Sequence, residues 1–538
     1  MTKSKYPNVW EIDPSSYRHW IATEEKRFAS NLRVSSRVKF SVVMPVHDPS
    51  LPMLREAVDS ILEQTHCNWE LCLADDASTN SQVVEELRNL ALRDERVHLK
   101  RFETNQGIAA ASNGALELAS GKYIVLVDQD DRLPSHALAT VEYYLNINSA
   151  AKLLYSDSDH LDADGERCKP FFNPDWDYQR LLSQNYLNHL TFIEHGLLKK
   201  VGGWRDGYQG SQDYDLYLRL AEELQEEEIQ HIPHILYHWR IVPGSVARSS
   251  IGESVKAART AIKAHLARRG YSARVEPAGR AVIFNHIAWK LPKRKLRVLM
   301  ALHDHSKSQV DAVPPATGTE KIECRFLDLH APGSGPLRTK EIAQEMDSGA
   351  YDAFCVSKAG IRALSEHLLE DTLATSATGL FGVIGTKCIT DSGSLHGGPL
   401  FTVPRDEGPP TAATEKALSS PRAESRGYIA NLLLDQSVDA LSPEFLMVGD
   451  SALRRMGGLE SSYLSVNHLA DSLCRSARKA GLRNAWLAGL VIATGPGVPD
   501  SGNAPLEQRE TGRPDTSEPF LYPNPNFRTL DWKVHWSD

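Results

Sequence analysis

The sequence predicts an α/β protein whose first part is built on a doubly wound, mostly parallel sheet. Between about residues 38 and 131, apolar segments alternate with segments of helical period in the order β-α-β-α-β-α-β. The connections between these segments are short, as in parallel sheets with crossover helices. Polar residues follow each of the four strands, at the sheet edge where such folds bind their ligands.

The individual elements follow from local patterns. Each predicted strand is a short apolar run, and each predicted helix repeats its apolar residues every three to four positions. An amphipathic leading helix is predicted from Tyr17 to about Leu32. Strands are predicted over 38–46, 69–78, 96–103 and 122–128, and further helices over 51–65, 81–95, 107–120 and 253–269.

Length and composition limit the function classes. The chain has 538 residues and a net charge of -9, so we expect two to four domains and no nucleic-acid partner. Seven scattered cysteines without a C-x-x-C pair indicate reduced thiols in a cytoplasmic protein. Neither a signal peptide nor a membrane span is expected, because long apolar runs are absent from the sequence. The expected division is an N-terminal helical segment (1–37), a first domain (38–290) and a second domain with a C-terminal extension (291–538).

The second half of the chain repeats features of the first half. Three similar pairs of segments in the same order predict an internal duplication. Counted from a shared Gly-x-Tyr, residues 128–131 (Asp-Gln-Asp-Asp) face residues 356–359 (Val-Ser-Lys-Ala), and Asp213 faces His468 or Leu469. Without these carboxylates the second copy is expected to be catalytically inactive. The similar segments are 38–50 with 296–308, 120–132 with 348–360, and 199–208 with 454–463.

Three carboxylates come at the end of the predicted strand that contains "YIVLV". Asp128, Asp130 and Asp131 repel one another in a desolvated position unless a positive charge offsets them. Two carboxylates one residue apart at a strand end can bind a hard divalent cation such as Mn²⁺ or Mg²⁺. The chain holds five Asp-x-Asp pairs, so a solvated turn is the alternative. The position directly after a buried strand favours the metal.

Two further segments contain candidate functional residues. Asp213 begins a helical pattern in "GSQDYDLYLRL", where it either acts in catalysis or complements the helix dipole. His238 and Arg240 follow an apolar strand in "YHWR" and are candidates for a third metal ligand and a phosphate contact. The alternative for this pair is a core histidine and a surface arginine.

Together these segments resemble glycosyltransferase family 2, whose catalytic domains have the GT-A fold. The resemblance covers about residues 38–290 and is closest to bacterial enzymes that build O-antigen and other surface polysaccharides. The second half resembles the tandem modules of that group, which implies a degenerate GT-A-like domain. The motifs that carry the resemblance are "PVHDP" (45–49), "ADDAST" (74–79), "NQGIAAASNGAL" (105–116), "VDQDD" (127–131), "SQDYDL" (211–216) and "YHWR" (237–240).

The resemblance implies a donor site for a nucleotide-diphosphate sugar and a metal. Asp128 and Asp130 would position Mn²⁺ or Mg²⁺ on the diphosphate, with His238 completing the metal shell. Asp213 would be the general base for the acceptor hydroxyl, so that the anomeric configuration inverts. This chain has Gln212 before the base, where many relatives carry Glu. The donor-site residues implied by the family are Pro45, Val46, Asp48, Asp75, Asp76, Asn105, Gly107, Asn113, Gln129, Asp131, Gln212 and Arg240.

Two other function classes fit parts of the pattern. A nucleotidyltransferase also binds metal at strand ends, but it would need a Gly-rich, basic phosphate loop after the first strand, and "PVHDPSLP" has neither feature. A non-catalytic saccharide-binding or scaffold subunit fits the second half of the chain. It does not account for the metal and base residues of the first half.

The family analogy also gives expectations about substrates and location. It implies UDP, dTDP or GDP in the donor and a glycan acceptor, expected to be lipid-linked at the inner membrane face. The protein is then expected to be cytoplasmic. Peripheral membrane association would use the leading helix, the basic stretch 290–297 or a partner protein.

Overall fold

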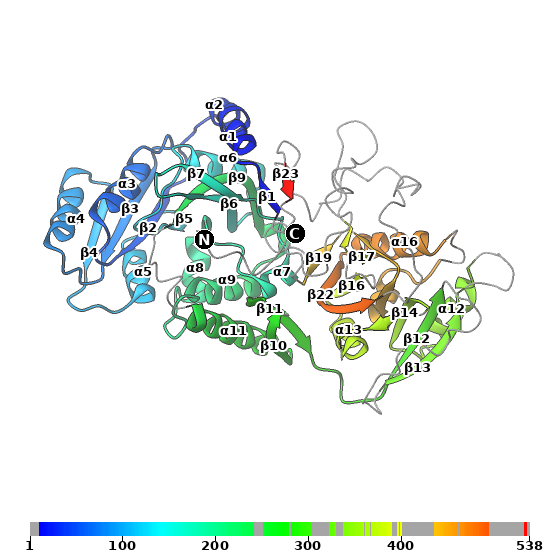
Figure 1. Cartoon of the computed structure of the whole chain (residues 1–538). Coiled ribbons are helices and arrows are strands. Elements are labelled where there is room, and N and C mark those ends of the chain that lie inside the picture. The colour runs from blue at the N-terminus through cyan, green and yellow to red at the C-terminus, as the bar shows by residue number, and fades with distance from the viewer. Residues whose placement is uncertain are drawn as a thin grey trace.

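The computed structural model of the chain contains two large β-sheets, one in each half of the sequence (Figure 1). Each sheet has its own hydrophobic clusters. The structure describes residues 10–241, 251–278, 281–303, 322–329, 337–359, 532–534, and 361–493 except for 366, 390–394, 398, 401–434, 439, 461–462 and 464.

The first sheet is parallel on one side and mixed on the other. β2 (Phe40–Val46) lies between β3 (Trp69–Asp75) and β5 (Tyr123–Leu126) and pairs with both in parallel. β4 (Val97–Arg101) continues the parallel side beyond β3. The four predicted strands are therefore confirmed. Beyond β5 follow the antiparallel strands β8 (Thr191–Glu194), β6 (Leu153–Leu161) and β7 (Arg167–Phe171), and β9 (Ile229–Arg240), which is parallel to β6.

Helices cover both faces of the first sheet, so it is doubly wound as predicted. Leu54, Leu87 and Leu138 bring α3, α4 and α6 onto one face. Ala111 and Leu198 belong to the cluster on the other face, together with apolar residues of α9 and α11. None of the described helices is long and apolar enough to cross a membrane. The helix bounds are Leu51–Leu62 (α3), Ser81–Arg93 (α4), Ile108–Leu116 (α5), Ala137–Ile147 (α6), Tyr178–Ser183 (α7), His195–Val201 (α8), Gln212–Glu223 (α9) and Ile251–Arg268 (α11).

The predicted leading helix is present and docks on the first sheet. Tyr17 is buried and donates its hydroxyl hydrogen to Asp159 of β6 over 2.5 Å. Arg167 of β7 joins Asp159 to Glu25 with ion pairs of 2.6 Å. The segment is thus part of the first core. It consists of α1 (Pro14–Trp20), the π-helix η1 (Ile21–Glu25) and α2 (Lys26–Asn31).

The second sheet has the strand order β13-β12-β14-β21-β16-β22-β15. Its first two pairings are parallel: β12 lies between β13 and β14 and runs in the same direction as both. The strand bounds are Leu296–His303 (β12), Ile322–Asp328 (β13), Ala353–Lys358 (β14), Arg362–Ala363 (β15), Phe381–Ile389 (β16), Phe445–Gly449 (β21) and Arg483–Ala493 (β22). Helices include α12 (Thr339–Asp347), α13 (Leu368–Ala377), α15 (Asp450–Arg455) and α16 (Val466–Lys479).

The two sheets share the order and the direction of their pairings. β5 and β8 pair antiparallel, as do β14 and β21, and β8 and β6 pair antiparallel, as do β21 and β16. β6 and β9 then pair in parallel, as do β16 and β22. The second sheet has no described counterpart of β4. This agreement in topology supports the predicted internal duplication. The likeness of the second half to a GT-A domain stays a prediction.

Backbone hydrogen bonds align the two sheets more closely than sequence counting does. The first N–H of α8 bonds to the Lys122 carbonyl, and the first N–H of α15 bonds to the Asp352 carbonyl. These two bonds pair Lys122 with Asp352. Six residues after each of them, Asp128 corresponds to Lys358. Counting from the shared Gly-x-Tyr had placed Val356 opposite Asp128, which is shifted by two residues. The carboxylate that is predicted to bind a metal in the first sheet is thus replaced by a lysine in the second sheet.

The two halves meet through a buried polar contact. Ser437, in β19 (Gln436–Val438), donates from its backbone N–H and its hydroxyl to Asp177, which caps α7. Arg180 of the same helix is fully buried and donates to Gln436 over 2.9 Å. The second half therefore holds the start of a helix that belongs to the first half.

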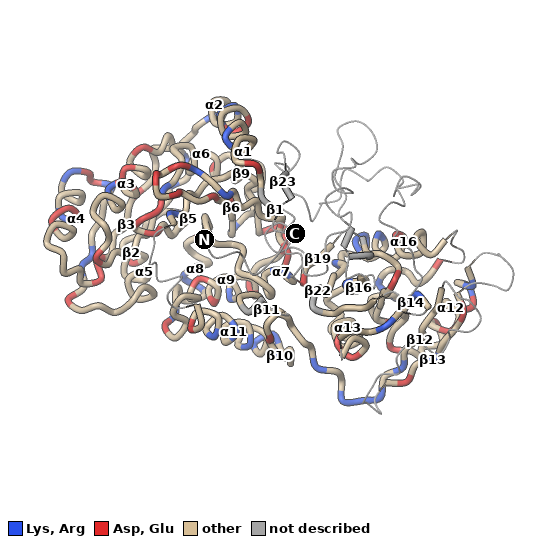
Figure 2. Tube along the Cα trace, viewed as in Figure 1, with Lys and Arg blue, Asp and Glu red and all other residues tan. Residues whose placement is uncertain are grey.

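The basic stretch 290–297 connects the two sheets and is visible as a run of blue in Figure 2. Arg294 forms an ion pair with Asp352 over 2.5 Å, and Lys295 forms one with Glu323 over 3.2 Å. Both carboxylates belong to the second half of the chain. These contacts favour the role of a linker over that of a membrane anchor.

The buried ion pairs of His231 predict a pH-dependent stability. His231 lies between Asp157 and Asp175, with nitrogen–oxygen distances of 3.0 Å on both sides. Burial acts to lower the pKa of this imidazole, but the two carboxylates raise it to about 9. Its stabilising charge is therefore complete below the unfolded pKa of about 6.5 and is lost as the pH rises through 9.

We expect the free energy of unfolding to fall by about 3 kcal/mol per such histidine between pH 6.5 and 10. Asp435 likewise raises the pKa of His286 to about 9 against the effect of burial, so two groups contribute to the wild-type slope. Urea unfolding across this range should show a shallower slope for His231→Gln. An unchanged slope in the variant would contradict the assignment.

Candidate active site

Four loops meet at the carboxyl ends of the parallel strands, with His47 between them. Its Nδ1 is 2.9 Å from the Asp76 carbonyl oxygen and its Nε2 is 3.1 Å from Asn105 Nδ2. Its backbone N–H donates to Gln129 Oε1 over 2.9 Å. The imidazole and the backbone N–H of His47 thus connect the loops that follow β2, β3, β4 and β5. His47 lies within a segment noted for its polar strand end, but no role was predicted for it.

The carboxylates of the first two loops hold these loops in shape. Asp48 accepts hydrogen bonds from Thr79 and from the Asn80 backbone. Asp76 accepts from the backbone N–H groups of Gln106 and Gly107, each over 2.8 Å. As a predicted donor-site residue, Asp76 would therefore bind the donor with oxygens that already order the next loop.

The other predicted residues of this region are mostly buried. Asp75 accepts from the Ser78 N–H over 2.9 Å and lies 3.5 Å from Arg101. Pro45 and Val46 are buried at the end of β2. Their predicted contact with a nucleotide has no open surface to support it. Exposed polar residues of these loops include His47, Asp48 and Asn105.

Asp128, Asp130 and Asp131 come together directly after β5. Desolvation by the surrounding protein and repulsion by Asp130 raise the pKa of Asp128 to about 7. Desolvation also raises the pKa of Asp130, although Arg240 and His189 act to lower it. About a third of the Asp128 side chain remains exposed, so its oxygens can still be reached by a ligand.

Asp131 differs from Asp128 and Asp130 because its carboxylate is buried and both of its oxygens accept hydrogen bonds from the protein. It accepts from the Arg240 backbone N–H over 2.7 Å and from the Tyr237 hydroxyl over 2.6 Å. Burial, followed by repulsion from Asp128 and Asp130, raises its pKa well above the ordinary value. Asp131 therefore fixes the end of β9 against the aspartate loop, and its predicted role in donor binding is indirect.

Arg240 lies beside the aspartates, as its predicted phosphate contact requires. Its Nε donates to the Asp130 carbonyl over 2.9 Å, and its Nη2 forms an ion pair of 2.5 Å with Glu56. The guanidinium is thus held at the rim of the site by its own neighbours.

The Nδ1 atom of His238 is paired with a carboxylate of the protein, which leaves only Nε2 for its predicted role as a metal ligand. Its Nδ1 lies 2.6 Å from Asp159, a buried carboxylate that also binds Tyr17 and Arg167. Among the described residues, no group of three or more His, Cys, Asp or Glu side chains could hold a metal ion. Within the described part of the chain, the protein ligands available to a metal ion at this position are therefore the two carboxylates of Asp128 and Asp130.

Two half-buried carboxylates of this kind fit a divalent cation that keeps water or diphosphate oxygens in its other positions. The pKa values of both carboxyl groups are raised, which indicates that nearby positive charges of the protein do not offset the cost of burying their negative charges. Mn²⁺ and Mg²⁺ both accept such oxygen ligands. The residues present thus fit the predicted metal, and the part of His238 in binding it stays a prediction.

His189 is a residue of the site that sequence reasoning missed. Its Nε2 is 3.8 Å from Asp128, and its ring stacks on Tyr237 with centroids 4.7 Å apart. Burial lowers the pKa of this imidazole, although Asp213 and Asp130 act to raise it. It lies in the segment "NYLNHL" (185–190), where nothing in the local spacing distinguishes this histidine from a core residue.

Asp213 is buried at the beginning of α9, as predicted. Its Oδ1 accepts from Trp204 Nε1 over 2.8 Å, and its Oδ2 accepts from Gln212 Nε2 over 3.1 Å. Burial raises the pKa of this carboxyl, whereas His189 and the hydrogen bonds from Trp204 and Asn188 act to lower it. A carboxylate with a raised pKa, next to the aspartate cluster, is suited to accept a proton near neutral pH.

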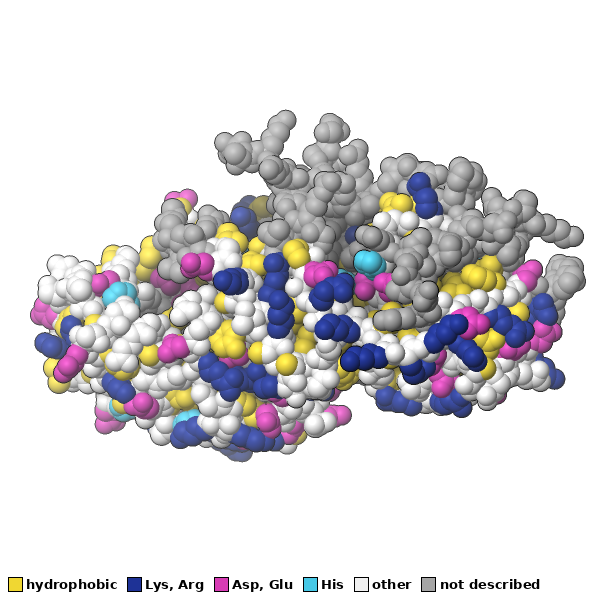
Figure 3. All heavy atoms as spheres, turned by 90° about the horizontal axis from the view of Figure 1, so that it is seen from below, with side chains coloured by type: hydrophobic (Ala, Val, Ile, Leu, Met, Phe, Trp, Pro, Cys, Tyr) yellow, Lys and Arg dark blue, Asp and Glu magenta, His cyan; other side chains and the backbone are white. Residues whose placement is uncertain are grey.

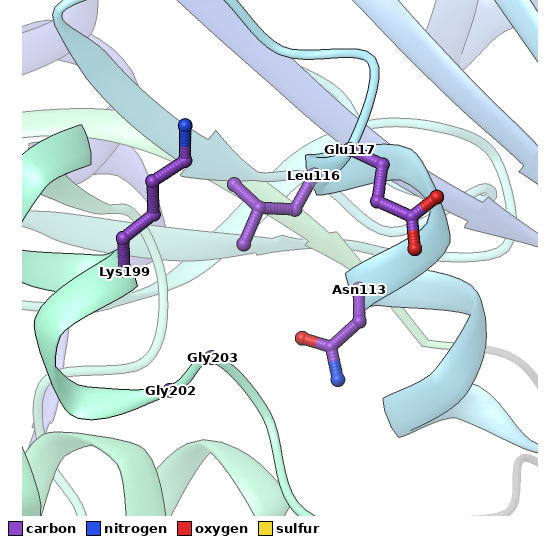
Figure 4. A pocket seen from close by; sticks show the side chains of 6 residues that line it. All are labelled: Asn113, Leu116, Glu117, Lys199, Gly202 and Gly203. Atoms are coloured by element: carbon purple, nitrogen blue, oxygen red, sulfur yellow. The ribbon is translucent and has the colours of Figure 1, made fainter.

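Asn113 does not face the nucleotide side of the site. Its Nδ2 donates to the Trp204 carbonyl over 2.8 Å, and its Oδ1 accepts from the Trp204 N–H over 3.0 Å. An open pocket of about 270 Å³ lies beside it, lined by residues of α5 and α8 (Figure 4). The pocket lies beside neither the aspartates nor the base, so it is not the donor site.

Comparisons with known proteins identify the family. The profile described as "Glycosyl transferase family 2" matches residues 41–151. An uncharacterized glycosyltransferase of Haemophilus influenzae is 32% identical over 190 residues, which are 35% of this chain and 73% of that protein. The O-antigen biosynthesis protein RfbC of Myxococcus xanthus is 39% identical over 270 residues, which are 48% of this chain and 21% of RfbC.

A longer match extends across both halves of the chain. The uncharacterized protein y4gI of Sinorhizobium fredii is 30% identical over 484 residues, 84% of this chain. The chain spans about half the length of y4gI. Among solved structures, S. aureus TarS 1-349 in complex with UDP-GlcNAc is 20% identical, with a TM-score of 0.36, 42% of this chain covered and 66% of that chain. On the sequence matches and the mostly parallel first sheet, the chain belongs to glycosyltransferase family 2.

Proposed function

We propose that the chain is an inverting, metal-dependent glycosyltransferase that moves a sugar from a nucleotide-diphosphate sugar to a glycan hydroxyl. The observation that carries this proposal is that Asp128, Asp130 and Asp213 form one electrostatically connected site. Asp130 raises the pKa of Asp128, and Asp128 in turn raises that of Asp213. Membership in family 2 supports the same reaction class.

Asp128 and Asp130 would hold Mn²⁺ or Mg²⁺. A bound cation would supply the positive charge that stabilises the diphosphate as the sugar leaves it. Arg240 is placed to contact the same diphosphate, because its guanidinium is held beside Asp130. The exposed loop surface at His47 and Asn105 is our candidate for the nucleoside end of the donor.

Asp213 would accept the proton of the acceptor hydroxyl as that oxygen bonds to the anomeric carbon. The bond from this carbon to the diphosphate oxygen breaks, and the nucleoside diphosphate leaves with the electron pair. Attack from the face opposite the leaving group inverts the configuration. One base suffices, so a second catalytic carboxylate, as glycosidases have, is not required.

Two buried amide oxygens support an acceptor site beside Asp213. Asn188 Oδ1 and Gln212 Oε1 have no hydrogen-bond partner among the described residues. Buried acceptors of this kind are normally satisfied, and the hydroxyl groups of a sugar are donors that can satisfy them. We propose that they bind the acceptor glycan.

The acceptor we propose is a surface polysaccharide such as O-antigen, lipid-linked at the inner membrane face. The similarity to RfbC supports this class of product. The donor nucleotide is UDP, dTDP or GDP by family analogy. Figure 3 shows several Lys and Arg side chains gathered across the middle of this face, with Asp and Glu side chains scattered around them.

For the second half we propose a degenerate, non-catalytic GT-A-like domain over 291–538, following a catalytic domain over 38–290. The shared order of strand pairings supports this division. Lys358 takes the place of Asp128, and a cation at that position repels a metal ion instead of binding it. His468, ten residues after Gly458, takes the place of Asp213, ten residues after Gly203.

Calorimetric titration of the full chain with UDP, dTDP and GDP tests the proposal. We expect one nucleotide to bind, with its affinity at least about tenfold higher in the presence of Mn²⁺ than after chelation. If no nucleotide binds, or if binding ignores the metal, the donor site is refuted. A saccharide-binding scaffold would then be the better explanation of the fold.

A further inference from the structure

Three residues from separate elements form a continuous set of hydrogen bonds that ends at Asp213. Trp204, in the loop after α8, donates from its indole Nε1 to Asp213 Oδ1 over 2.8 Å. The backbone of the same tryptophan is held by both amide atoms of Asn113, at 2.8 and 3.0 Å. Trp204 is only 4% exposed, so its ring has little freedom to leave this position.

The local sequence explains why the loop can approach α5 so closely. Gly202 ends α8 in the left-handed region with φ of 83°, and Gly203 follows with φ of 64°. A Cβ atom on Gly203 would lie 2.4 Å from Asn113 Oδ1, which is too close for any side chain. Figure 4 shows Asn113 of α5 beside Gly203. The glycine pair therefore permits the contact between Asn113 and the backbone of Trp204.

The second half of the chain provides an internal comparison. It keeps the glycine pair as Gly457 and Gly458, both with positive φ, but the next residue is Leu459. A leucine side chain cannot donate a hydrogen bond. Asp213 corresponds to His468 when counted from the glycine pair and to Asn467 when counted from the helix start, and neither is a carboxylate.

The helix contact is lost in the second half as well. The N–H of Glu117, just after α5, bonds to the Asn113 carbonyl, and the N–H of Ser348, just after α12, bonds to the Gln344 carbonyl, so Asn113 corresponds to Gln344. Gln344 is exposed. The second half thus lacks counterparts of the base Asp213, of its hydrogen-bond donor Trp204 and of Asn113, which holds Trp204. If Trp204 and Asn113 only stabilised the fold, a half with the same strand order could keep them after losing Asp213. The loss of all three residues together indicates that they act together.

We infer that Trp204 is a positioning residue for the base Asp213, and that Asn113 holds Trp204 in place for this task. The inference rests on the proposed function. A donor on Oδ1 fixes the rotation of the carboxylate and favours its charged form. The groups that face Asp213 from other elements are His189, whose imidazole supports the charged form, and Asp128, which opposes it.

The test is Trp204→Phe in the full chain, which keeps an aromatic ring and removes the N–H. We expect kcat to fall by about 10- to 100-fold with the donor Kd unchanged. The acid limb of the pH profile of kcat should also move to higher pH, because the unsupported carboxylate keeps its proton longer. Asn113→Ala should change both quantities in the same direction and to a smaller extent.

Trp486→Phe is the matched control. Trp486 is fully buried in the second half, and its indole N–H has no partner within the part of the chain that the structure describes. We expect it to leave kcat and the pH profile unchanged. Thermal unfolding of each variant checks that it is folded.

The outcomes separate the inference from the function on which it rests. Wild-type transfer together with an unchanged kcat and pH profile in Trp204→Phe would overturn the positioning role alone. A loss of kcat without any shift of the acid limb would assign Trp204 to packing and would also overturn it. Absence of metal-dependent nucleotide binding in the wild type refutes the proposed function itself.

Discussion

Asp213→Asn is expected to remove most of the sugar transfer and to leave nucleotide binding intact. The amide keeps the shape of the carboxylate and can still accept from Trp204 Nε1, but it cannot take the proton of the acceptor hydroxyl. General-base catalysis contributes about 10²- to 10⁴-fold, so kcat should fall by that factor. Initial rates with the donor found by titration, and the donor Kd measured beside them, check this result.

The control for this substitution is Asp206→Asn, the same chemical change at an exposed position in the preceding loop. It should leave kcat and Kd unchanged. If Asp213→Asn retained more than about a tenth of the wild-type kcat, Asp213 would not be the base. If the variant lost nucleotide binding as well, the carboxylate would belong to the donor site instead.

Asp128→Asn and Asp130→Asn are each expected to abolish the metal dependence of nucleotide binding. With two protein carboxylates as the whole ligand set, neutralising one removes half of the negative charge that attracts the cation. Metal ions supply several kcal/mol in such sites, so the nucleotide affinity in Mn²⁺ should fall about 100-fold or more. Calorimetric titration with and without the metal measures the loss.

The same two variants should unfold at a higher temperature than the wild type in the presence of a chelator. Asp130 repels Asp128 in the metal-free protein, and an uncharged amide relieves that repulsion. Asp164→Asn is the matched control, because Asp162 and Asp164 form another Asp-x-Asp pair in an exposed turn. Equal losses of metal dependence in the control and in Asp130→Asn would show that the effect is not specific to the site.

Much of the first domain could be predicted because its determinants are local. Strands such as β2 and β5 are short apolar runs, buried along their length, between helices with an apolar stripe. Their parallel order follows from short crossover connections. Asp128 and Asp130 follow the end of β5 and Asp213 begins α9, so these three residues could be chosen from position and residue type.

The sequence by itself was enough to name Asp128, Asp130 and Asp213 as candidate functional residues, and the tertiary structure decided which partners each of them has. His238 was a plausible ligand by its place after a strand, but it is paired with Asp159, two residues before the end of β6. His189 and Trp204 reach the site from segments whose local pattern marks neither. The physical reason is that hydrogen bonds and charge act over a few ångströms in space, and that distance is fixed by packing between elements far apart in the chain.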